Sequence, residues 1–151
     1  MIAGHFGFAA LVKSRERSTP LWILMLASVW LDIVFSPLFV VGVETMQTVR
    51  GRHGYGAAII HADYTHALVG MVALSAILGT VCWPFRRRRS AIVIGLVVAS
   101  HWVLDLIVHR ADMPFLPANL LHLPQVGFGL WQYPAVSSIL ELALVLAGAW
   151  A

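Results

Sequence analysis

Three ionisable residues recur at a helical spacing inside a long apolar stretch. His101, Asp105 and His109 follow one another at intervals of four residues, which places them on one face of a helix because side chains four apart lie above one another. Four consecutive arginines at 86–89 precede an apolar run at 91–99. Ionisable groups are costly inside a bilayer, so this stripe predicts a functional site within a membrane.

The composition indicates a small helical membrane protein that forms one domain, residues 1–151. Hydrophobic residues make up 60% of the chain and charged residues only 11%, whereas soluble proteins average about 25% charged residues. Several apolar stretches are long enough to cross a membrane. We therefore predict an all-α integral membrane protein with a short interfacial or half-inserted helix at 1–12, followed by four transmembrane helices at about 21–43, 57–83, 90–109 and 130–150.

Two basic clusters predict the orientation of these spans. Lys13, Arg15 and Arg17 follow the first apolar segment, and the arginines at 86–89 separate the second span from the third. Both clusters flank apolar segments, so they predict topology and contact with membrane lipids, and they argue against a nucleic-acid partner. The positive-inside rule places both clusters on the cytoplasmic side, and we expect both termini there as well.

Each predicted span carries an acid or a histidine at a similar depth. At about 1.5 Å per residue, Asp32, His101 and Glu141 lie roughly 14 to 18 Å from the cytoplasmic ends of their helices. Imidazole and carboxylate groups that converge from different helices suit zinc and other first-row divalent metals. We therefore predict a divalent metal site, with zinc expected first and manganese or another first-row metal as alternatives. The predicted core ligands are His66, His101 and Asp105, completed by Asp32 or His5.

A metal of this kind predicts hydrolytic chemistry. A catalytic metal keeps an open coordination position and lowers the pKa of bound water, and a nearby carboxylate then acts as general base. Glu141 and Asp63 are the candidates for that base. His109, Arg110 and Asp112 lie near the outer end of the third span and are predicted to line the entrance or to bind substrate. The bilayer setting favours an amphiphilic or lipid-like substrate that enters from the non-cytoplasmic side.

Two other functions fit the same residues. A chain of acids and histidines in a membrane can relay protons or transport a metal ion. Such a path needs polar groups in the cytoplasmic half of the spans, where Ser28 and Thr80 stand almost alone. A non-enzymatic membrane protein could also use the polar residues only to hold its helices together.

Short motifs follow one another in a recognisable order along most of the chain to about residue 112. They are Gly4-His5-Phe6-Gly7, Leu31-Asp32-Ile33, His61, Thr65-His66, and His101 followed by Asp105. In this order they resemble the family of predicted membrane-bound metal-dependent hydrolases, which includes the LexA-regulated inner-membrane hydrolases of bacteria. The resemblance implies a compact helical protein of a bacterial-type inner membrane with a His/Asp metal site. It suggests as ligands His5, Asp32, His61, His66, His101 and Asp105.

Two positions depart from the pattern of that family. The family usually has an arginine after the histidine that matches His61, where this chain has Ala62. Arg110 or Arg52 would have to replace that arginine in holding an anionic substrate group. The small hydroxyl residue that usually follows the histidine matching His66 is Ala67 in this chain.

Overall fold

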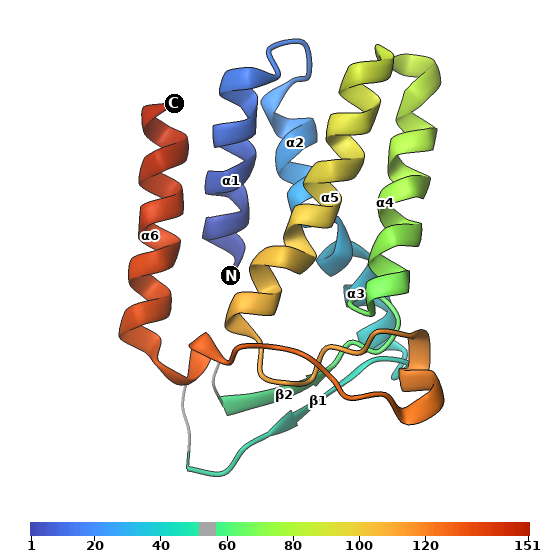
Figure 1. Ribbon diagram of the computed structural model, residues 1–151, viewed down its shortest axis with the longest axis vertical. Helices are drawn as coiled ribbons and strands as arrows, with labels where there is room; N and C mark the ends of the chain where they lie inside the picture. The colour runs from blue at the N-terminus through green and yellow to red at the C-terminus, as the bar shows by residue number, and fades with distance from the viewer. Residues whose placement is uncertain (52–56) are drawn as a thin grey trace.

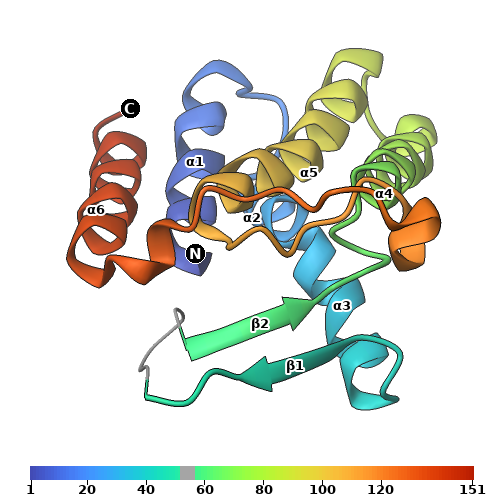
Figure 2. The same cartoon turned by 60° about the horizontal axis from the view of Figure 1, so that its bottom comes forward.

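The helices of this chain stand side by side, and a small β-hairpin lies across one end of them (Figures 1 and 2). The computed structural model describes residues 1–51 and 57–151. Within these residues the chain is mostly helical, as predicted. The elements are α1 (Ile2–Arg15), α2 (Leu21–Ser28), α3 (Trp30–Val40), β1 (Thr45–Thr48), β2 (Ala58–His61), α4 (Leu68–Cys82), α5 (Arg88–Val108), α6 (Pro134–Trp150) and the short 3-10 helices η2 (Trp83–Phe85), η3 (Pro117–His122) and η4 (Leu130–Gln132).

The helices offer fewer complete membrane spans than the four that were predicted. Two helical segments in the described residues, Leu68–Phe85 and Arg88–Val108, are long and apolar enough to cross a membrane. The bent pair α2 and α3 makes a third if it is counted as one span. Helix α6 is apolar but shorter, so four transmembrane helices are not confirmed.

The first predicted span is broken into two helices. The axes of α2 and α3 differ by 49°, and the break lies at Val29, where φ is −118° and ψ is 18°. Proline is the usual cause of a sharp kink, but Pro37 lies inside α3, eight residues further on. At the break, the carbonyl of Ser28 accepts a hydrogen bond from a side chain of α5 instead of continuing a straight helix.

The second predicted span begins as a strand and not as a helix. Strands β1 and β2 pair antiparallel, with Thr45 opposite His61 and Thr48 opposite Ala58. The β-branched pair Ile59-Ile60 favours a strand, and its partner comes from the segment between the first two predicted spans. Helix α4 therefore starts only at Leu68.

Helices α1 and α6 pack side by side at one edge of the bundle (Figure 1). A Cβ atom at Gly7 would lie 2.5 Å from the carbonyl oxygen of Leu144, so glycine is needed for this close approach. Both helices run in the same direction, which leaves Met1 near the hairpin end and Ala151 at the other end (Figure 1). This arrangement does not support the prediction that both termini lie on the same side.

The end of the bundle opposite the hairpin holds both basic clusters (Figure 1). Glu16, buried in the loop after α1, accepts hydrogen bonds from Ser18, Thr19 and Ser90. The Nε atom of Arg89 lies 3.4 Å from the Glu16 carboxylate. The hydrogen bond from Ser18, with help from Ser90 and Arg89, holds the pKa of the Glu16 carboxyl below its ordinary value although burial opposes this.

We predict that Glu16→Gln lowers the free energy of unfolding by about 1 kcal/mol at pH 7, because charge-assisted hydrogen bonds at the start of α5 weaken. A carboxyl whose folded pKa is lowered stabilises the fold above its unfolded pKa, and the contribution disappears as the pH falls through the folded pKa. Denaturant unfolding in detergent should therefore give different free energies of unfolding for the wild type and Glu16→Gln at pH 7. The two free energies should become equal in acid. An equal difference at both pH values would contradict this role.

Candidate metal centre

Five imidazole and carboxylate side chains meet in one cluster near the hairpin end of the helices. His5 comes from α1, Asp32 from α3, and His66 from the turn that precedes α4. His101 and Asp105 come from one face of α5, one helical turn apart. Four of the five are buried, and only Asp32 is open on one side, with 38% of its side chain exposed.

Five separations among four donor atoms of this cluster are close to those expected around one metal ion. Nε2 of His66 and Nε2 of His101 both lie 3.6 Å from Oδ1 of Asp32 and 3.2 Å from each other. Oδ2 of Asp105 lies 3.1 Å from Nε2 of His101 and 3.7 Å from Nε2 of His66. Ligands at about 2.0 to 2.2 Å from a tetrahedral ion are roughly 3.4 Å apart. These residues could therefore hold a divalent ion.

The backbone fixes the tautomer of His101. Its Nδ1 lies 2.7 Å from the carbonyl oxygen of Ser28, beside the break between α2 and α3. A carbonyl only accepts, so Nδ1 carries the proton and Nε2 is the atom that faces the other donors. One Nε2 lone pair binds one ion. His5, His101 and Asp105 form one potential metal-binding group and Asp32, His66 and His101 another, so the shared His101 can serve only one of them at a time.

A buried glutamate fixes the tautomer of His66 through a threonine. The carboxylate of Glu44 lies 3.0 Å from the Thr65 hydroxyl, which lies 2.9 Å from Nδ1 of His66. Because a carboxylate accepts, the hydroxyl donates to Glu44 and accepts from Nδ1 of His66. Glu44 also accepts from the amides of Tyr64 and Thr65, which holds this turn in place.

The two tautomers leave the cluster with two nitrogen lone pairs that suit a cation. With both imidazoles neutral, two Nε2 lone pairs face each other at 3.2 Å. A shared cation satisfies both of them, whereas without one a ring must take up a second proton. Two carboxylates, Asp32 and Asp105, also balance the charge of a divalent ion. The donor set thus fits one such ion.

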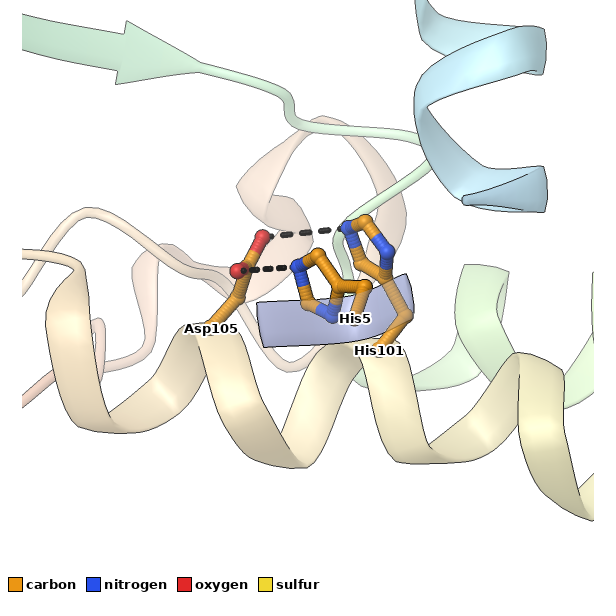
Figure 3. Close-up of side chains that lie close together, drawn as sticks. All are labelled: His5, His101 and Asp105. Carbon is orange, nitrogen blue, oxygen red and sulfur yellow. Dashed lines mark hydrogen bonds and ion pairs between the residues drawn. The ribbon is translucent and has the colours of Figure 1, made fainter. Parts of the chain in front are cut away.

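His5 contacts the other oxygen of Asp105. Figure 3 shows the two carboxylate oxygens directed to different imidazoles, Oδ1 to His5 and Oδ2 to His101. Nε2 of His5 lies 3.0 Å from Oδ1, and its ring stacks on His101 with centroids 4.0 Å apart. His5 therefore orients both a carboxylate and an imidazole of the donor set.

A cavity of about 260 Å³ opens onto the cluster. Asp32, His66 and Asp105 line it beside apolar residues that include Phe35, Ile60 and Trp131. His109 lines it as well; its Nε2 lies 3.5 Å from Oδ2 of Asp105 and its Nδ1 lies 3.0 Å from Oδ1 of Asp112. Asp112 also accepts from the amide of Ile60 and so ties the hairpin to the end of α5.

Four residues singled out in the sequence lie elsewhere, and the potential metal-binding groups of the described residues include none of them. His61 ends β2, where the sequence predicted the start of the second span. Glu141 accepts a hydrogen bond from the amide of Gly4 at 3.1 Å and caps the start of α1. Asp63 lies in the turn after β2, where its carbonyl accepts from Ala118. Arg110 follows α5 and its carbonyl accepts from Asp112, while Arg52 lies outside the described residues.

Three positioning groups were missed from the sequence. The Ser28 carbonyl could not be foreseen, because its role depends on the helix break. One sequence feature could have drawn attention to Glu44: it is an acid that directly follows an apolar run. Thr65 stood beside His66 in a motif but had no assigned role.

Comparison of the chain with protein-family models, curated proteins and solved structures found no match. The description of the site therefore rests on its residues and their geometry.

We predict that His101→Ala abolishes stoichiometric metal binding, whereas His61→Ala leaves it unchanged. The first variant removes a donor that faces Asp32, His66 and Asp105, and the second removes a strand histidine outside the cluster. Elemental analysis measures the metal content of both variants, provided that each remains monodisperse in size-exclusion chromatography. Equal metal content in the two variants would contradict the proposed donor set.

We predict that Thr65→Val weakens metal affinity by about 10- to 100-fold, the usual cost of losing the group that orients a ligating histidine. Valine keeps the shape of the side chain but cannot accept the proton of Nδ1 of His66. Thr48→Val on the exposed strand β1 is the matched control. Titration with Co²⁺, followed by its visible absorption, gives both dissociation constants, and equal values for the two variants would exclude this role of Thr65.

Proposed function

We propose that this chain is a membrane-embedded metal-dependent hydrolase that acts on an amphiphilic, lipid-like substrate from the non-cytoplasmic side. One observation carries the proposal: the donor atoms of Asp32, His66 and Asp105, which neighbour His101, line a cavity whose other walls are largely apolar. Such a cavity accepts a molecule with an apolar body and places its polar group beside the donors.

Asp32, His66, His101 and Asp105 would hold the ion, which we propose to be zinc, with manganese or another first-row metal as alternatives. When bound there, a divalent ion supplies Lewis acidity for hydrolysis of an ester. The partly exposed side of Asp32 leaves the donor set accessible from the cavity. A catalytic ion needs a coordination position for water beyond its protein ligands, and the cavity beside Asp32 is the side from which water would reach it.

His109 is placed to transfer the proton. Its Nδ1 donates to Asp112 at 3.0 Å, which orients the ring and leaves Nε2 on the side of Asp105. His109, held between Asp105 and Asp112, would give a proton to the leaving oxygen as the bond from that oxygen to the acyl carbon breaks. It would recover a proton from the water whose oxygen bonds to the same carbon, so that the ester yields a carboxylic acid and an alcohol. We assign this role to His109 in place of Glu141 and Asp63.

The position of the site supports the proposed membrane setting. The cluster lies toward the hairpin, away from the basic clusters at 13–17 and 86–89 (Figure 1). If those clusters face the cytoplasm, the cavity opens on the other side. The motifs that resemble those of the predicted membrane-bound metal-dependent hydrolases support this setting, and we propose that the protein lies in a bacterial-type inner membrane.

We predict that His109→Gln lowers kcat for a chromogenic acyl ester by about 10²- to 10⁴-fold, the usual contribution of a general acid-base group. Metal content should not change, because His109 is outside the four-donor set. His122→Gln, at an exposed histidine of η3, is the matched control. Loss of activity in the control, or none in His109→Gln, would remove His109 from the mechanism.

The same protein in liposomes separates hydrolysis from transport. Under the proposed function, the wild-type protein hydrolyses esters and conducts neither protons nor metal ions. A flux that disappears in His101→Ala, with no hydrolysis by either protein, would favour the transport alternative. A folded His101→Ala that differs from the wild type in neither property would favour a purely structural polar cluster.

A further inference from the structure

A second hollow lies directly beside the candidate metal centre, between α1 and the broken span α2–α3. Its volume is about 240 Å³. Three of its residues, Ile2, Asp32 and Ser36, also line the cavity at the cluster, so the two hollows adjoin at Asp32. The remaining lining residues are apolar: Phe6, Val29 and Ile33.

This hollow opens toward the outer surface of the bundle. Ile2 is 51% exposed and Ile33 is 39% exposed at its edges. Helix α2 also exposes large apolar residues, among them Trp22 and Leu26. In a bilayer such a surface contacts hydrocarbon, because the membrane interior offers no water to apolar side chains. In a bilayer this hollow would form a groove that meets hydrocarbon at its exposed edge and the donor set at Asp32.

The helix break shapes this groove. Val29, where α2 ends and α3 has not yet begun, is one of its lining residues. Asp32 follows in the first turn of α3 and is far more exposed than the other donors, at 38% against 0% for His101 and 5% for Asp105. The one donor that is accessible thus stands where the apolar groove meets the polar cavity.

We infer that the groove binds one hydrocarbon chain of the substrate, which enters sideways from the bilayer. This inference rests on the proposed function and names its substrate class: a long-chain acyl ester whose scissile bond lies where the chain joins the polar group. The chain occupies the groove, and the polar group passes Asp32 into the cavity. The volume is below the roughly 300 Å³ at which pockets begin to enclose drug-sized ligands, which suits one chain.

Two hydroxamic acids test the inference through binding and without turnover. Acetohydroxamic acid carries only the metal-binding group, whereas the dodecyl analogue adds a hydrocarbon chain. Changes in the visible absorption of the Co²⁺-loaded protein report both dissociation constants. Ile33→Trp should raise the dissociation constant of the dodecyl compound by about tenfold, because the indole overfills the groove, and should leave that of acetohydroxamic acid unchanged.

Leu26→Trp is the matched control, because it adds the same indole on the exposed face of α2, outside the groove. Phe6→Trp, on the opposite wall, repeats the test should Ile33→Trp fail to fold. An unchanged dodecyl affinity in the groove variants would overturn the inference while leaving the metal site intact. Failure of acetohydroxamic acid to bind the wild-type protein would instead refute the metal centre, and the inference with it.

A photoreactive dodecyl hydroxamic acid locates the chain directly. With a diazirine at the chain end, it should cross-link to α1 or α3 in the metal-loaded protein, and much less in the metal-free protein. Equal labelling of both forms would show that the groove holds a structural lipid, which would contradict a substrate chain.

Discussion

The hydrogen bond from Nδ1 of His101 to the Ser28 carbonyl links the fold of this chain to the chemistry of its cluster. It joins α5 to the end of α2 at the point where the first predicted span breaks. It also leaves Nε2 of His101 facing Asp32, His66 and Asp105. A bent span, a fixed tautomer and a shared donor therefore meet at one contact, and a single Nε2 lone pair on His101 serves only one ion.

The hairpin end completes what the helices cannot supply alone. His66 comes from an irregular turn, so a helix does not fix its direction; Thr65 and the buried Glu44 do so instead. Asp112 ties β2 to the end of α5 and orients His109 at the same time. The polar residues outside the donor set thus hold imidazoles at fixed angles, which is how ligating histidines are tuned in metal sites.

Much of the cluster could be predicted because helical spacing is a local property. His101 and Asp105 share a face of α5 by their interval of four, and Asp32 lies at a matching depth. The predicted span at 57–83 does not begin as a helix, because Ile59-Ile60 pairs as a strand with a segment that carries no strong signal of its own. Glu44 and Ser28 escaped prediction because their roles depend on distant contacts. The partner of Glu44 lies 21 positions along the chain, and the partner of Ser28 lies 73 positions along it.

We propose that one ion per chain is held by two imidazoles and two carboxylates. X-ray absorption spectroscopy of detergent-purified, zinc-loaded protein of measured stoichiometry tests this proposal. We expect one zinc per chain, nitrogen and oxygen ligands at about 2.0 to 2.2 Å, and scattering from two imidazole rings. A sulfur ligand, a second metal at about 3.5 to 4 Å, or no bound zinc would contradict it.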